Sequence, residues 1–147
     1  MGKVAIIGVG QSTFVRSYPG SIRELAFEGF REAMQDANIK NTDIDASIVC
    51  SAPEYDKQRS PAGVLAEYLG LNPQPTFYVE SLCSSSSMGL RLAYSLVKSG
   101  LHDVVAVIGF HVLTYLLFPR ITFFPVIMIL SALVFFSPDW PRAQILL

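Results

Sequence analysis

The chain lacks the charge pattern and the ligand pattern that mark several classes of protein. It has 11 Lys and Arg residues against 12 Asp and Glu residues, a formal net charge of −1, and no basic cluster. Nucleic-acid binders need a basic surface, so we expect no nucleic-acid partner. The two cysteines and two scattered histidines lack the spacing of metal ligands, so we also expect no zinc site.

An export signal is also lacking at the start of the chain. The segment "MGKVAIIGVG" has one lysine, a very short apolar run and no small-residue cleavage site. The chain has only two cysteines, Cys50 and Cys83. We therefore expect a reducing cytoplasm rather than a compartment in which disulfides form.

Glycine is absent from residues 111–147, and charge is scarce there, with only three charged residues, Arg120, Asp139 and Arg142. This change divides the chain into a domain, residues 1–110, and an apolar tail, residues 111–147. The longest uncharged run is marginal against the ~20 apolar residues of a membrane-spanning helix. The tail could be a membrane segment, a buried or partner-facing extension, or sequence foreign to the domain, as a shifted reading frame would produce. We favour the last and expect the tail to contribute nothing to an active site.

Residues 1–110 alternate short Val- and Ile-rich runs with amphipathic segments. Strands are expected at 3–10, 45–53, 75–81 and 104–110, and helices at 21–38, at 60–71 and after Cys83. Such alternation predicts an α/β fold: a mostly parallel sheet, βαβαβαβ, with right-handed crossovers and helices on both faces. The first run suits a strand that is buried on both faces.

Two of the expected helices carry clear end signals. Ser21 and Glu24 have the spacing of a capping box. In the next helix Ser60 is placed to cap the start, Pro61 fits the first position, and Gly70 lies past the end. These signals predict where the two helices begin and where the second one ends.

The stretch "VESLCSSSSMGLRLAYSLVKSG", residues 79–100, places a cysteine and four serines before a helix. Serine runs are typical of linkers, but the apolar stripe that follows, from Met88 to Val97, predicts a largely buried helix. Cys83 would then lie at a helix start, where free N–H groups and the helix dipole favour the thiolate, at the sheet edge that holds sites in α/β folds. The residues alone leave open that Cys83 is a small core residue, the role that we expect for Cys50.

The glycines of "GVGQST", residues 8–13, suggest a dinucleotide-binding turn. However, the third glycine position is Thr13, and "FVRSYPG" separates the turn from the helix. A pyrophosphate needs a turn that opens directly onto a helix N-terminus. We therefore reject dinucleotide binding.

The segments "VAIIGVGQSTFVR", "IRELAFEGFREAMQDANI" and "VESLCSSSSMGLRLAYSLVKSGLHDVVAVIG", in this order, resemble the N-terminal half of the thiolase superfamily, especially archaeal acetyl-CoA acetyltransferases and the thiolase domain of sterol carrier protein X. The resemblance covers about residues 3–110. It implies that Cys83 carries the acyl group as a thioester. It also implies an acyl-CoA substrate, no bound cofactor, and a homodimer joined through the third strand. Ser86, often glycine in relatives, and the sequence after Gly109 depart from the family pattern.

In that family a second half supplies a histidine and a further cysteine or an equivalent base, and nothing in residues 111–147 matches those motifs. His111 is the better-placed histidine, because the fourth strand ends at the sheet edge of Cys83, whereas His102 follows the far end of the helix. The resemblance therefore implies a thiolase-type acyltransferase that is incomplete and inactive in turnover. The alternative is a non-catalytic acyl- or lipid-binding or assembly subunit.

Overall fold

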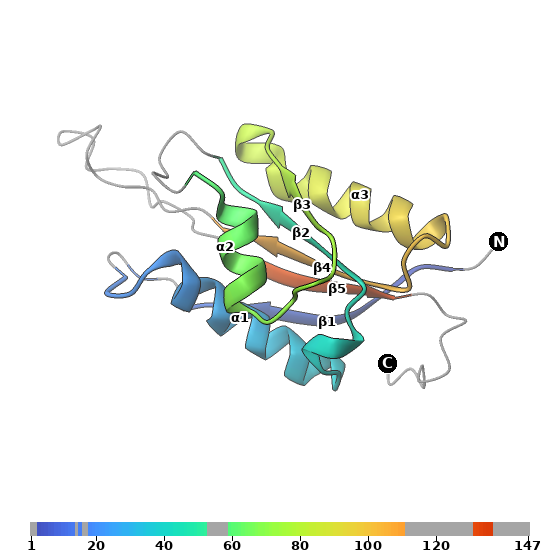
Figure 1. The fold of residues 1–147 in the computed structure, drawn as a ribbon, viewed down its shortest axis with the longest axis horizontal. Helices are drawn as coiled ribbons and strands as arrows, with labels where there is room; N and C mark the ends of the chain where they lie inside the picture. Colours follow the sequence, from blue (N-terminus) through green and yellow to red (C-terminus); the bar gives the residue numbers. More distant parts are fainter. Residues whose placement is uncertain (1–2, 14, 16–17, 53–58, 111–130, 137–147) are drawn as a thin grey trace.

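The computed structural model describes residues 3–13, 15, 18–52, 59–110 and 131–136. A five-stranded sheet lies between helices, with α1 and α2 on one side and α3 on the other (Figure 1). Each face has its own apolar cluster: one includes Leu25, Phe30 and Leu65 under α1 and α2, and the other includes Ile48 and Ala93 under α3. The expected α/β architecture with helices on both faces is confirmed.

The strand order across the sheet is β1-β5-β4-β2-β3. Strands β2, β3 and β4 pair in parallel, whereas β5 is antiparallel to both β1 and β4. Four of the five strands therefore run in the same direction, and the expected mostly parallel sheet is confirmed. The strand bounds are Ala5–Gln11 for β1, Ala46–Cys50 for β2, Thr76–Val79 for β3, Val104–Gly109 for β4 and Ser131–Phe136 for β5.

The helices begin and end close to their predicted signals. They are α1 (Ile22–Ala37), α2 (Pro61–Tyr68) and α3 (Ser85–Lys98), with short 3-10 turns η1 (Asn41–Asp43) and η3 (Leu82–Ser84). The Ser21 capping box is present in α1, and Gly70 follows α2 with a φ of 66°, which glycine adopts without strain. Ser60 occupies the N-cap position of α2, but its side chain makes no capping hydrogen bond.

The tail contributes a strand, which the sequence did not predict. Residues 131–136 form β5 and pair with β4 on one side and with β1 on the other. Without β5, β1 would have no strand partner among the described residues. The division of the chain at residue 110 stays a prediction, and the other residues of the tail lie outside the described ones. In the part of the chain that the structure describes, no helix is long and apolar enough to cross a membrane.

Strand β1 is not buried on both faces, so that prediction is wrong. Ile6 and Val9 are 55% and 52% exposed, because α1 covers only one face of this edge strand and α3 packs mainly over β4 and β2. On the covered face, Gly8 and Gly10 let α1 approach closely: a Cβ at Gly8 would lie 2.7 Å from Cβ of Ala37. These glycines serve helix packing within a strand, which agrees with the rejection of a dinucleotide-binding turn.

The two edges of the sheet differ in what their outward backbone groups meet. At the β1 edge, the N–H of Val9 donates to Asp36 Oδ2 at 2.9 Å, and the N–H of Gln11 donates to Glu32 Oε2 at 2.8 Å. Both carboxylates come from α1, which lies near because of the glycines. At the other edge, no described strand pairs with the outer side of β3.

Candidate functional site

Three parallel strands end together at one edge of the sheet, and both cysteines lie there. Cys50, the last residue of β2, is in register with Val79 of β3 and Gly109 of β4. The chain then passes from Val79 through the η3 turn into α3, and Cys83 is the central residue of that turn. Cys83 is exposed and Cys50 is buried, and both are free thiols. The predicted place of Cys83, at the carboxyl edge and before a helix, is confirmed.

The residue before Cys83 has an unusual backbone conformation. Leu82 has a φ of 49°, in the left-handed region that residues other than glycine rarely adopt. Such a conformation costs of order 1–3 kcal/mol and persists only where surrounding contacts hold it. One of these contacts is a hydrogen bond of 2.9 Å from the N–H of Leu82 to Glu80 Oε1. The side chain of Leu82 is 52% exposed, so burial of its apolar surface does not explain the conformation.

A second set of contacts centres on the hydroxyl of Ser85, the first residue of α3. This hydroxyl donates to the carbonyl of Leu82 at 2.7 Å, lies 3.1 Å from the carbonyl of Ser51, and accepts from the N–H of Ser81 at 2.8 Å. Ser85 is only 4% exposed. In turn, the hydroxyl of Ser51 lies 2.8 Å from that of Tyr78 on β3. The turn that carries Cys83 is thus tied to the ends of both β2 and β3.

Cys50 has the core role that the sequence predicted. Burial raises the pKa of its thiol from 9.0 to about 12, since the thiolate would lose its hydration. Its sulfur packs against Gly89 of α3, so closely that a Cβ at that position would overlap Sγ. Cys50 therefore stays protonated and shielded at neutral pH.

Helix α3 is less buried than its apolar stripe predicted. Its fully buried residues form one narrow line: Ser85, Gly89, Ala93 and Val97. Met88 and Tyr94 are 46% and 48% exposed. The prediction of a largely buried helix is therefore wrong for the described structure. The small residues Ser85, Gly89 and Ala93 let the helix pack close to the sheet, so the longer side chains on either side of this line stay exposed. Of the four serines, only Ser85 is buried.

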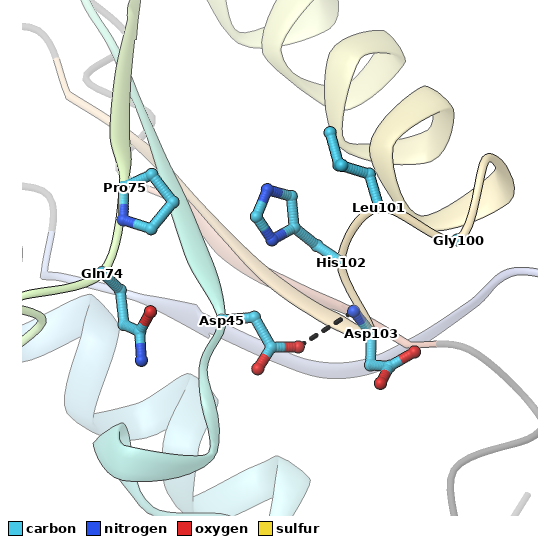
Figure 2. A pocket seen from close by; sticks show the side chains of 7 residues that line it. All are labelled: Asp45, Gln74, Pro75, Gly100, Leu101, His102 and Asp103. Carbon is cyan, nitrogen blue, oxygen red and sulfur yellow. Dashed lines mark hydrogen bonds between the residues drawn. The ribbon is translucent and has the colours of Figure 1, made fainter.

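The histidines do not join Cys83 in the described structure. His111 lies outside the described residues. His102 lies at the opposite edge, where the parallel strands begin, as its distance along the helix predicted. There it lines an open cavity of about 300 Å³ (Figure 2), together with Asp45, Gln74, Pro75, Gly100, Leu101 and Asp103. Asp45 Oδ2 accepts from the N–H groups of Asp103 and Val104, both at 2.9 Å, so its role there is to join the starts of β2 and β4.

Sequence reasoning missed the features that hold the turn around Cys83. A leucine gives no signal for a left-handed conformation, and four consecutive serines do not reveal which hydroxyl turns inward. The spacing of Gly89 and Ala93 after Ser85 could have indicated that Ser85 lies on the buried line of α3, because residues four apart share a helix face. Within the described ranges, no group of three or more His, Cys, Asp or Glu residues could hold a metal ion.

This arrangement of sheet, turn and helix matches solved structures of condensing enzymes. The chain superposes on 3-oxoacyl-[acyl-carrier-protein] synthase III from Aquifex aeolicus with a TM-score of 0.78 and 18% sequence identity, covering 94% of this chain and 55% of that one. The superposition on a single-residue variant of OleA from Xanthomonas campestris gives a TM-score of 0.75 at 18% identity, covering 93% and 58%. These similarities define the class of fold.

Sequence similarity then defines the family. Residues 4–116 match the family described as "Thiolase, N-terminal domain", and the chain belongs to this family. It is 41% identical over 116 residues to the acetyl-CoA acetyltransferase of Methanocaldococcus jannaschii and 35% identical over 116 residues to that of Methanothermobacter thermautotrophicus, in each case 78% of this chain. The chain spans 30% of the length of each of these relatives. The resemblance stated from the sequence is confirmed.

Proposed function

We propose that the chain is the nucleophile-bearing part of a thiolase-type acyltransferase that takes an acyl-CoA as substrate and uses no resident cofactor. The observation that carries this proposal is the exposed thiol of Cys83, at the carboxyl edge of the sheet and the start of α3, in a chain of the thiolase family. Because relatives of the chain are acetyl-CoA acetyltransferases, we propose that the acyl group is acetyl.

The proposed step is a transfer between two sulfur atoms. The Cys83 thiolate attacks the thioester carbonyl of the acyl-CoA, forming a bond from Sγ to the carbonyl carbon. The bond from that carbon to the sulfur of coenzyme A then breaks, and coenzyme A leaves as a thiolate that takes up a proton. The N–H groups of Ser84 and Ser85 already donate to the carbonyls of Ser81 and Leu82, so the positive end of the α3 dipole, rather than a free N–H group of these two residues, would stabilise the oxyanion that forms between these two events.

Completion of a catalytic cycle needs a base as well as a nucleophile. His102 lies at the wrong edge of the sheet, so none of the described histidines serves Cys83. Loss of one such group typically lowers a rate by ~10²-fold or more. The 147-residue chain by itself is therefore expected to accept one acyl group slowly and to show no turnover, with His111 as the first candidate if turnover is seen.

The experiment is incubation of the purified chain with acetyl-CoA, followed by intact-mass and peptide analysis. We expect a gain of at most one acetyl group, on the peptide that contains Cys83, and no formation or cleavage of acetoacetyl-CoA. Cys50→Ala is the matched control and should be acetylated as the wild type is, whereas Cys83→Ala should not be acetylated. Acetylation that persists in Cys83→Ala would contradict the proposal.

A non-catalytic acyl- or lipid-binding or assembly role is the second candidate. It is favoured by the apolar side chains of Leu82 and Met88, 52% and 46% exposed on η3 and the first turn of α3, and by that of Tyr94, 48% exposed further along α3. Binding of acyl-CoA, measured by calorimetry, without any acetylation of Cys83 would support this role over the first.

We also propose that the protein acts in the cytoplasm as a homodimer joined edge to edge through β3. The N–H of Ser47 donates to the carbonyl of Pro75, so by the parallel pairing pattern Phe77 faces β2 and Tyr78 directs its N–H outward. Tyr78→Pro removes that outward donor and should abolish the dimer in analytical ultracentrifugation. Tyr78→Phe, which loses only the hydroxyl, should remain dimeric. A wild-type chain that is monomeric at every concentration would contradict the proposed dimer.

A further inference from the structure

We propose that Ser85 is a positioning residue for Cys83: its buried hydroxyl holds Leu82 in the left-handed conformation and so keeps the thiol exposed. The inference rests on the proposed function, because it gives Ser85 a part in presenting the proposed nucleophile. Its physical basis is independent of any substrate, and so is its test.

The argument begins with the backbone on both sides of Leu82. Rotation about φ of Leu82 changes the direction in which the chain continues, and Cys83 is the next residue. A leucine with a φ of 49° would relax to a negative φ if nothing opposed it. The orientation of Cys83 therefore depends on whatever fixes the two peptide groups that flank the Leu82 Cα.

One of these peptide groups is held by a hydrogen bond to an exposed side chain, and the other by a hydrogen bond from a buried side chain. Glu80, an exposed side chain, accepts from the N–H of Leu82. Ser85, which is 4% exposed, donates to the carbonyl of Leu82 at 2.7 Å. The peptide group with that carbonyl also contains the backbone nitrogen of Cys83. The hydrogen bond from the Ser85 hydroxyl therefore fixes the peptide group that joins Leu82 to Cys83.

The hydroxyl of Ser85 is itself held in place. It accepts from the N–H of Ser81 at 2.8 Å and lies 3.1 Å from the carbonyl of Ser51 at the end of β2. Cys50, the neighbour of Ser51, contacts Gly89 one helical turn after Ser85, so the same strand end fixes α3 twice. Because Ser85 is anchored to a buried strand, the conformation of the turn is set by the core of the domain.

The neighbouring serine hydroxyls do not replace this contact. Ser84 donates to the carbonyl of Ser81 at 2.8 Å and lies 3.0 Å from the Ser81 hydroxyl, which closes the turn on its outer side. Ser87 is exposed on α3. Among the side-chain hydrogen bonds of the four serines, the one from Ser85 reaches the carbonyl of Leu82, which also accepts from the backbone N–H of Ser85.

The test compares the rates at which iodoacetamide labels Cys83 at pH 7 in folded variants. Ser85→Ala should lower this rate about tenfold, because the Leu82 carbonyl then keeps only the backbone N–H of Ser85 as a donor and the population of the exposed arrangement falls. Ser87→Ala, on the same helix, should keep the wild-type rate. Adding Leu82→Gly to Ser85→Ala should restore most of the rate, since glycine adopts a positive φ without strain.

A role in stability alone would give a different pattern. Ser85→Ala would then lower the melting temperature but leave the labelling rate of the folded chain unchanged, and that result would overturn the inference. A double variant with Leu82→Gly that stays as slow as Ser85→Ala would also overturn it.

If Ser85→Ala does not fold, variants of Glu80, which accepts from the N–H of Leu82, test the inference instead. Glu80→Ala should slow labelling of Cys83, and Glu80→Gln, which keeps an acceptor for the N–H of Leu82, should not. Equal rates in both Glu80 variants and the wild type would overturn the inference. Failure of acetylation by acetyl-CoA would count against the proposed function and leave these ratios of labelling rates unaffected, so the two failures are distinguishable.

Discussion

Cys50 ends β2 and Cys83 follows the neighbouring parallel strand β3 at the same edge of the sheet, yet one is buried and the other exposed. Cys50 is the last residue within its strand, and the absence of a side chain at Gly89 leaves room for its sulfur under α3. Cys83 lies in a turn beyond the end of its strand. The difference teaches that two features decide whether a thiol at this edge is buried or exposed. One is whether the cysteine lies within the strand or a few residues past its end, and the other is whether a glycine on the facing helix leaves room for the sulfur.

The largest expected difference is in chemical labelling. At pH 7 iodoacetamide should modify Cys83 at least ~10³-fold faster than Cys50, because Cys50 reacts only when the core opens. Peptide mass spectrometry after limited treatment measures the ratio. The Cys83→Ala variant should show almost no label until denaturant is added. Labelling of Cys50 at a comparable rate in the folded wild type would refute this distinction.

Removal of β5 should abolish the distinction. A chain truncated after Phe110 loses the strand between β4 and β1, so we expect it to unfold and both thiols to label at similar rates. The sequence alone predicted a dispensable tail. Far-ultraviolet circular dichroism and the labelling ratio check this together, with a chain ending at residue 137 as the control. A folded truncated chain that still protects Cys50 would show that β5 is dispensable.

The Cys50–Gly89 contact offers a finer test. Gly89→Ala places a Cβ against Sγ of Cys50 and should destabilise the fold by about 1–3 kcal/mol. In a Cys50→Ala background the other neighbours of that Cβ lie 3.4 Å or more away, so the same substitution should cost at least ~1 kcal/mol less.

Urea denaturation of the four chains measures this coupling. Gly63→Ala on α2 is the matched control, because its new Cβ would meet only Ser60 Oγ, at 3.2 Å. Additive effects of the Cys50 and Gly89 substitutions would show that α3 accommodates the new Cβ equally well with and without Sγ of Cys50.

The last expected effect is on stability at alkaline pH. The folded state holds the Cys50 proton up to a pKa of about 12, whereas the unfolded thiol releases it from about 9.0. The contribution of the Cys50 thiol to the free energy of unfolding is therefore fully present below pH 9. From pH 9 towards pH 12 this free energy falls by about 1.4 kcal/mol per pH unit.

Cys50→Ala should lack this part of the decline. Tyr18 also has a raised pKa, about 12, through its hydrogen bond to Glu28, but it is present in both chains and cancels in the comparison. Equal pH dependence of the two chains between pH 8 and 11 in urea denaturation would show that the thiol of Cys50 is already solvated.

The sequence predicted the parts of the fold that follow from local patterns. The helix that begins after Ser21, the four parallel strands, the carboxyl-edge position of Cys83 and the core role of Cys50 all follow from periodicity, capping residues and strand order. Strand β5 was missed because the composition of the tail obscured it. The left-handed Leu82 and the inward hydroxyl of Ser85 were missed because they depend on contacts with Ser51, far along the chain, that no local pattern encodes.

The carboxylates at the β1 edge have a consequence for how copies of this chain can assemble. A sheet with two open edges can add a neighbour on both sides and grow without limit, whereas a sheet with one open edge stops at a closed pair. Asp36 and Glu32 already accept from the outward N–H groups of Val9 and Gln11, so a strand arriving there would have to displace them. Asp36 and Glu32 thus oppose the addition of a strand at β1, so assembly through β3, if it forms as proposed, would end as a closed pair and not grow into a fibre.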